Sequence, residues 1–221
     1  MDVSNLVQTV AIYALPVLFA ITLHEAAHGY VARHFGDMTA YAQGRISLNP
    51  ARHIDLVGTI LVPITILVLS KFAGAGGFLF GWAKPVPVNY SALRHPKRDM
   101  MWVAAAGPAS NLAMALAWAV LYKLGEAAAP GDYATPVRLM SVAGIEVNVV
   151  LMLLNLLPIL PLDGGRIVAS LLPVRMSLQY SRLEPWGFPI LLLLMFSGYL
   201  GVFLGPMVKT SFNVIGTVFR F

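Results

Sequence analysis

The sequence contains no cysteine and little charge, and both shortages limit what the protein can be. Without cysteine, disulfide bonds and thiolate ligands are impossible, so any metal ion must be held by His, Asp or Glu. Only 11% of the 221 residues are charged and 58% are hydrophobic, whereas soluble domains are about 25% charged. These values predict an integral membrane protein, with the lipid bilayer as its surroundings.

The net charge of +5 does not indicate a nucleic-acid partner. The 15 lysines and arginines stand mostly between apolar runs, where membrane proteins place them against anionic headgroups. We therefore expect no nucleic acid among the partners.

Four runs are long and apolar enough to cross a bilayer, which takes about 20 residues. They are 3–23, 100–122, 139–162 and 186–208, and a shorter apolar run follows at 210–219. Residues 56–83 are broken by Lys71 and a Gly-rich stretch, so they form either one span with a loop or a re-entrant hairpin. We predict a single all-α membrane domain over residues 1–221, with about four full transmembrane helices plus the re-entrant or hairpin segment.

The first span continues into "HEAAH", residues 24–28. On a helix His24 and His28 lie one turn apart on the same face and can bind one zinc ion, while Glu25 can reach a metal-bound water. Ionisable residues within membrane helices are costly, about 2.5–3.5 kcal/mol each on insertion scales, and normally mark function. This pattern predicts two zinc ligands and a general base, Glu25, in a zinc hydrolase.

The third ligand is less obvious. If the helix continues, His34 lies six residues past His28, roughly 240° round the helix, and so faces away from the site. Apart from Glu25, the acidic residues in apolar spans are Glu146 and Asp163. We favour Asp163, because the prolines of "NLLPILPLDGG" (155–165) break its helix and a carboxylate there needs a cation.

Three further features allow two readings each. Asn155 either serves a substrate or bridges two helices. Asn111, in "AGPASN" (106–111), either packs helices closely or orients a ligand. "KPVPVN" (84–89) is either a Pro-rich loop or an extended edge that holds substrate by strand addition.

The three motifs "HEAAH", "AGPASN" and "NLLPILPLDGG", in this order, resemble the site-2 protease family of intramembrane zinc metalloproteases, peptidase family M50. The resemblance spans most of the chain and is that of a minimal form without a PDZ or CBS domain. It implies zinc as cofactor, His24, His28 and Asp163 as ligands and Glu25 as catalytic base. The implied activity is regulated intramembrane proteolysis, in which a transmembrane helix of a membrane protein is the substrate.

The resemblance also favours one reading for several supporting residues. It implies a substrate-binding role for Asn155 and a small membrane-associated β element near Pro85, Val86, Pro87 and Val88. For Asn111 we favour helix packing from the residues alone, and we group it with the candidate substrate-binding residues. It further implies a cell-membrane location, an active site near the cytosolic side, and residues 51 and 99 on the same side. A metal or proton transporter is disfavoured, because no internal repeat accompanies the polar residues.

Overall fold

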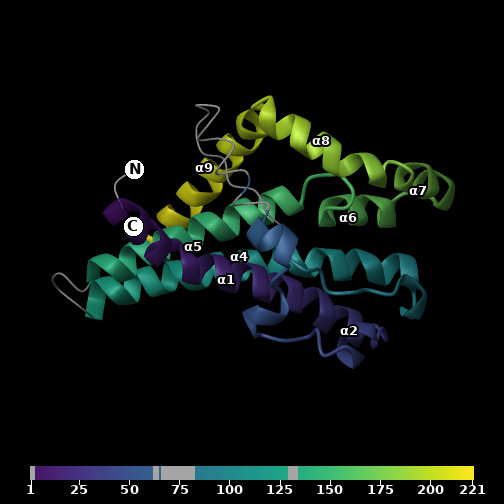
Figure 1. The fold of residues 1–221 in the computed structure, drawn as a ribbon, viewed down its shortest axis with the longest axis horizontal. Coiled ribbons are helices and arrows are strands. Elements are labelled where there is room, and N and C mark those ends of the chain that lie inside the picture. Colours follow the sequence, from purple (N-terminus) through teal and green to yellow (C-terminus); the bar gives the residue numbers. More distant parts are fainter. Residues whose placement is uncertain (1–2, 62–64, 66–82, 129–133) are drawn as a thin grey trace.

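A computed structural model describes residues 3–61, 65, 83–128 and 134–221, and in these ranges the regular structure is entirely helical (Figure 1). The α-helices are α1 (Val3–His34), α2 (Thr39–Ala42), α4 (Pro96–Ala128), α5 (Ala134–Asn155), α6 (Asp163–Leu171), α7 (Val174–Ser181), α8 (Glu184–Phe196) and α9 (Tyr199–Phe219). Short helical turns are η1 (Pro50–Arg52), η2 (Leu56–Leu61, a π-helix) and η3 (Tyr90–Ala92).

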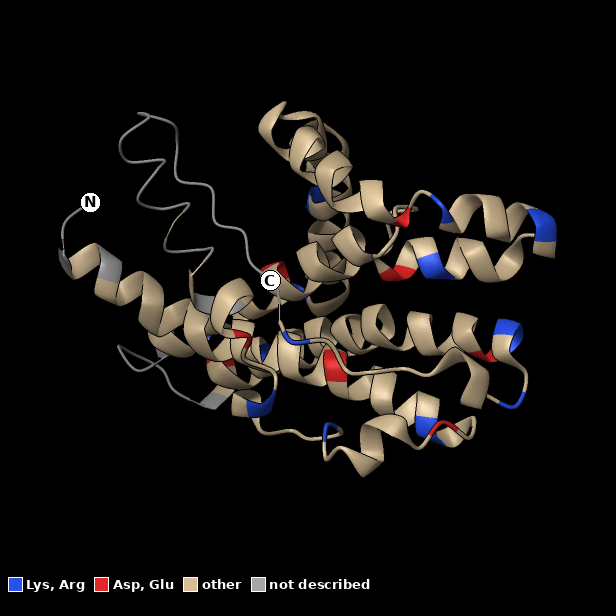
Figure 2. Ribbon diagram, turned by 45° about the vertical axis from the view of Figure 1, so that its right-hand side comes forward, with Lys and Arg blue, Asp and Glu red and all other residues tan. Residues whose placement is uncertain are grey.

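Four of the described helices are long and apolar enough to cross a membrane, which confirms the all-α membrane class. They are α1, α4, α5 and α9, with apolar spans at Val7–His34, Pro96–Ala127, Thr135–Asn155 and Tyr199–Phe219. Figure 2 shows long uncharged stretches of helix, with many of the charged residues near helix ends and in connections.

The expected fourth span, 186–208, is wrong in its bounds. The chain turns at Ser197 and Gly198, which separates the 13-residue α8 from the 21-residue α9. Gly198 has φ of 78°, a left-handed conformation that glycine adopts easily and that ends a helix. Hydropathy averaged over the run does not register this turn, and Lys209 lies inside α9 instead of ending a span. The third span likewise ends at Asn155 instead of continuing to residue 162.

Helices α1, α4 and α5 form the centre of the molecule, with α4 antiparallel to the other two (Figure 1). Ala115 and Ala119 of α4 are fully buried in the same cluster as Ile145 of α5. Gly144 brings α5 against the Trp118 ring so closely that an added Cβ would lie 2.3 Å from it. Small residues thus allow the helix backbones to approach, as in other membrane bundles.

After α5 the chain makes a short loop, and α6 packs against α4. The loop is tight, since a Cβ added at Gly164 would lie 2.3 Å from the carbonyl oxygen of Leu156. Only glycine fits this close approach, and it places Asp163, the first residue of α6, beside α1.

The connection from α1 to α4 starts and ends at the same end of the bundle. The Arg94 N–H donates to the Phe35 carbonyl at 3.0 Å, which agrees with the expectation that this connection does not make a single crossing. The predicted re-entrant or hairpin segment lies mostly in 62–64 and 66–82, outside the described residues.

The small β element is not found in the described part of the chain. Residues 83–89 are extended but pair with no strand. Pro85 and Pro87 have no N–H to donate to a ladder, and the Val86 N–H is bound by a side chain. The segment is therefore held by side chains and by one backbone bond, from the Lys84 N–H to the His53 carbonyl at 2.9 Å, instead of by a sheet.

Candidate metal centre

Three potential metal ligands meet where α1 passes the beginning of α6. The Asp163 Oδ2 lies 3.2 Å from His24 Nε2 and 3.4 Å from His28 Nε2, and the two Nε2 atoms are 3.1 Å apart. All three residues are nearly buried. In the described residues they form the one group of His, Asp and Glu side chains with ligand atoms close enough to share a metal ion.

The hydrogen bonds of the two imidazoles direct their lone pairs at one another. His28 Nδ1 lies 2.7 Å from the Val103 carbonyl, which can only accept, so Nδ1 carries the proton. His24 Nδ1 lies 2.6 Å from Asn111 Oδ1, likewise an acceptor. Both Nε2 atoms therefore present lone pairs toward a buried carboxylate oxygen that has no hydrogen-bond donor among the described residues. Three converging acceptors require a cation, and this set fits catalytic zinc.

Asn111 belongs to the support of this centre and does not line the cavity. It is fully buried, and its amide N–H groups donate to the Ala20 carbonyl at 3.3 Å and to Asn148 Oδ1 at 3.0 Å. These bonds fix its oxygen toward His24. We therefore correct its placement among substrate-binding residues: the structure supports the orientation of a ligand.

The glycine of "AGPASN" explains why α4 can approach the imidazoles. A Cβ added at Gly107 would lie 2.5 Å from both His24 Cε1 and His28 Nε2. The close contact expected from this motif is thus made with the two candidate ligands, His24 and His28.

A cavity of about 150 Å³ opens beside the three candidate ligands. Glu25, Asn155, Pro85, Val86, Val88 and Arg166 line it together with His24, His28 and Asp163. The Glu25 carboxylate accepts a hydrogen bond from the Val86 N–H at 2.8 Å, so the expected base and the expected substrate edge touch. Asn155 donates to its own helix at Leu151, 3.0 Å away.

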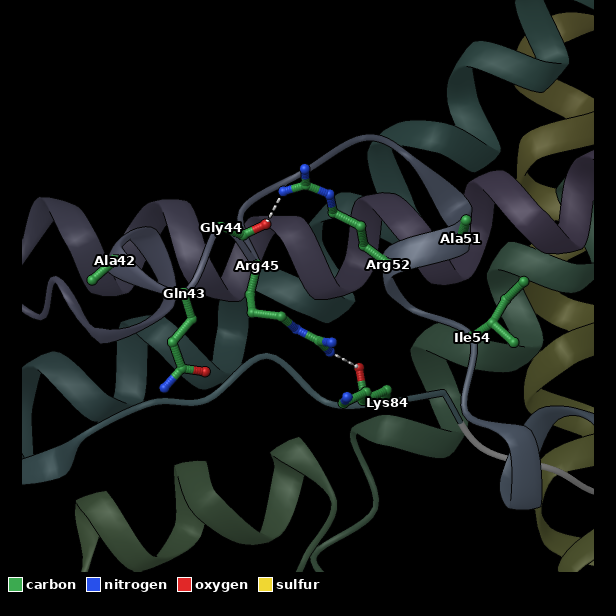
Figure 3. A pocket seen from close by; sticks show the side chains of 8 residues that line it. All are labelled: Ala42, Gln43, Gly44, Arg45, Ala51, Arg52, Ile54 and Lys84. Carbon is green, nitrogen blue, oxygen red and sulfur yellow. Dashed lines mark hydrogen bonds between the residues drawn. The ribbon is translucent and has the colours of Figure 1, made fainter.

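The extended segment 83–89 is tied to the rest of the molecule by residues that sequence reasoning missed. Arg45 donates to the Lys84 carbonyl at 2.9 Å (Figure 3) and to the Pro85 carbonyl at 3.3 Å. At the other end, the fully buried Asp37 accepts from the Asn89 N–H at 2.6 Å. Arg45 and Asp37 lie outside the apolar spans, where a charged residue is ordinary, so the sequence does not mark them as functional.

Other polar residues of the sequence stay away from the centre. His34 packs beside Phe35, as expected of a residue on the wrong face. His53 Nε2 lies 2.8 Å from the Ser47 carbonyl. Glu146 accepts from the Tyr13 hydroxyl at 3.0 Å, in the middle of α5, and is no ligand of this group.

Comparison with known proteins places this chain in a family. The model of peptidase family M50 matches residues 124–198. The protein YwhC of Bacillus subtilis (strain 168), named as a zinc metalloprotease, is 36% identical over 208 residues, covering 93% of this chain and 89% of that protein. The chain belongs to peptidase family M50. As a member it is a metalloprotease, with Zn²⁺ as cofactor.

A more distant relative supports the same assignment. Rip2 of Mycolicibacterium smegmatis, also named as a zinc metalloprotease, is 27% identical over 200 residues, covering 90% of this chain and 72% of that protein. No solved structure matches the chain significantly. The stretch matched by the family model contains Asn155 and Asp163 but not the histidines of α1.

Proposed function

We propose that this member of the M50 family is an intramembrane endopeptidase that cuts a transmembrane helix of a membrane protein. The observation that carries the proposal is the position of the metal centre within a span. His28 and His24 lie six and ten residues before the end of the apolar span Val7–His34, which corresponds to about 9 and 15 Å along the helix. A peptide bond reaching the cavity would therefore come from within or just below the bilayer surface.

His24, His28 and Asp163 would hold the zinc ion. When bound, zinc supplies a Lewis acid that polarises the scissile carbonyl and lowers the pKa of a water molecule. Glu25 takes the proton from the attacking water and returns it to the leaving amine. Asn155 has one amide N–H and its oxygen available for the substrate backbone, since the other N–H is bound to Leu151.

Residues 84–88 would hold the substrate in an extended form. A helix hides its carbonyl groups in internal hydrogen bonds, so the substrate must unwind before cleavage. The Val86 N–H faces the cavity and binds Glu25. A substrate carbonyl that takes over this N–H would release the Glu25 carboxylate for its role as base.

The distribution of charge supports a cytosolic position for the end of the bundle nearest the site. That end carries Arg33, Arg94, Lys97, Arg98 and Arg175, whereas the opposite end carries Lys123, Arg138 and Arg220. Cytosolic connections are richer in Lys and Arg. In this orientation the cavity would lie nearer the cytosolic side, from which water and cytosolic substrate segments can enter.

The proposal is tested by comparing membrane proteomes of cells that carry the wild type or Glu25→Gln. We expect fragments cut within a membrane helix in the wild type alone, with cleavage of such a segment reduced about 10²–10⁴-fold in the variant. The zinc content of both purified proteins should be one ion per chain. Full cleavage by the variant, or a wild type without zinc, would refute the proposal.

A further inference from the structure

The cavity beside the three candidate zinc ligands contains a permanent positive charge that the mechanism above does not use. Arg166 follows Asp163 by three residues on α6, so both side chains leave nearly the same face of that helix. Of the described residues that line the cavity, Arg166 is the one lysine or arginine. It therefore shares a small space with the residues that would hold a zinc ion.

The surroundings of Arg166 hold its guanidinium without neutralising it. Its Nε lies 3.4 Å from the Pro161 carbonyl, at the long end of a hydrogen bond, and Pro161 also lines the cavity. Within the described part of the chain no carboxylate oxygen lies within 4.0 Å of this guanidinium, since the ion pairs found there join other residues. An arginine has five N–H donors, so its terminal nitrogens remain for a ligand.

A half-buried arginine beside a dication is electrostatically unfavourable unless an anionic partner accompanies it. Peptide hydrolysis produces an anion in this place, because the scissile carbonyl oxygen gains negative charge when water attacks. Hydrogen-bond donors that are already in position around that oxygen are among the strongest contributions to the rate of such reactions.

We propose that Arg166 is a catalytic residue whose guanidinium binds the scissile carbonyl oxygen as it becomes negative. The inference rests on the proposed function, since it requires a peptide bond in this cavity. Asn155 lines the cavity from α5 and would then serve mainly the substrate backbone, while the charged donor comes from α6.

The experiment compares two ligands that differ in whether they carry a tetrahedral anion. N-phosphoryl-leucine amide presents phosphoryl oxygens like those of the attacked carbonyl, and a leucine hydroxamate chelates zinc through a planar group. Their affinities are measured by displacement of a fluorescent hydroxamate from the purified, zinc-loaded protein in detergent. We expect Arg166→Gln to weaken the phosphoryl compound roughly ten-fold or more, the loss typical of a charge-assisted hydrogen bond, and the hydroxamate less than about two-fold.

Arg166→Lys should recover part of the affinity, because it restores the charge but not the forked geometry. Arg175→Gln is the matched control: it removes an exposed arginine of α7 that does not line the cavity, and both affinities should stay unchanged. Zinc content is measured for every variant.

Four results would overturn the proposal. The first is an unchanged phosphoryl affinity in Arg166→Gln, and the second is a wild type that binds no phosphoryl compound. The other two are an equal loss of affinity for both ligands and a loss of zinc in Arg166→Gln, and either would show that Arg166 only supports the loop at Pro161. Failure of the proposed function appears differently, as a wild type that binds both ligands but cuts no membrane segment.

Discussion

Each imidazole of the metal centre has its second ring nitrogen fixed by α4, one by a carbonyl and one by the Asn111 side chain. The Asn111 bond to His24, 2.6 Å long, can be removed without touching a ligand. Such outer partners fix the tautomer and direction of a ligating histidine, and their loss typically lowers metal affinity 10–100-fold. Asn111 is therefore a direct test of whether His24 binds zinc through Nε2.

We expect Asn111→Ala to lower zinc affinity by about 10–100-fold, measured by competition with a chelator of known affinity. Asn155→Ala is the matched control, since that asparagine lines the cavity and makes no bond to the two histidines. It should keep zinc and lose cleavage. Equal zinc affinity in Asn111→Ala and wild type would contradict the assignment of His24 as a ligand.

The sequence predicts the residues that converge on the centre, but not all that hold them. A histidine or aspartate in an apolar span is conspicuous because of its burial cost, which is why His24, His28 and Asp163 could be named in advance. The partner of His28 is the carbonyl of Val103, and a backbone carbonyl leaves no mark in a sequence. Arg45, Asp37 and Arg166 escaped because arginines and aspartates outside apolar runs are ordinary.

At the level of elements, the contact of α4 with the metal centre depends on a glycine, Gly107, which has no side chain. An added Cβ at Gly107 would lie 2.5 Å from atoms of both imidazoles. Since α4 is packed against α1 and α5, its backbone cannot retreat without breaking those contacts. Gly107→Ala should therefore displace the imidazoles.

We expect Gly107→Ala to lose stoichiometric zinc while keeping its helix content, as measured by elemental analysis and far-UV circular dichroism. Gly201→Ala serves as control, because a Cβ at that position of α9 meets nothing within 4 Å. A Gly107→Ala protein with one zinc ion per chain would show that α4 does not approach the site as closely as described.

The extended segment 83–89 depends on Arg45 for its position. Removing this side chain leaves the Lys84 and Pro85 carbonyls without that donor while Glu25 and the metal donors stay in place. If residues 84–88 bind substrate, Arg45→Ala should raise KM roughly five-fold, with zinc content and kcat little changed, for a peptide containing a cleavage site.

Arg52→Ala provides the comparison for Arg45. Both arginines line the same pocket, but Arg52 donates to the Gly44 carbonyl in its own loop (Figure 3). Its removal should leave KM unchanged. Equal effects of the two substitutions would mean that loss of charge, and not loss of the bond to segment 83–89, changes KM.

At the element scale, sequence patterns predict the number of apolar helices more accurately than the positions at which the chain turns. The four-span count is right, yet the fourth span begins at Tyr199 because one glycine takes a left-handed conformation. The alternation of Pro and Val at 84–88 suggested a strand, but strand pairing needs N–H donors that proline lacks. Such differences depend on tertiary contacts, which hydropathy does not record.

On the scale of the whole molecule, the start of α1 and the end of α9 lie at the end of the bundle away from the metal centre (Figure 1). At the C-terminus the Phe221 ring packs against Tyr122 with centroids 4.6 Å apart, and Lys123 donates to the Arg220 carbonyl at 3.1 Å. These contacts fix the end of α9 beside the end of α4. The residues directly before α4 lie at the opposite end, where Phe35 meets Arg94.

This arrangement predicts the membrane topology. With the arginine-rich end in the cytosol, a reporter fused after Phe221 should lie outside the cytosol, and one inserted at Arg98 or Arg175 should lie inside. Alkaline phosphatase, active only outside, and green fluorescent protein, fluorescent only inside, give opposite readings at each position. Helix α8 is too short to span, at 13 residues against about 20. A reporter at Gly198 should therefore give the same reading as the one at Arg175 and the opposite reading to the one after Phe221. A cytosolic reporter after Phe221 would contradict both the span assignment of α9 and the orientation proposed for the active site.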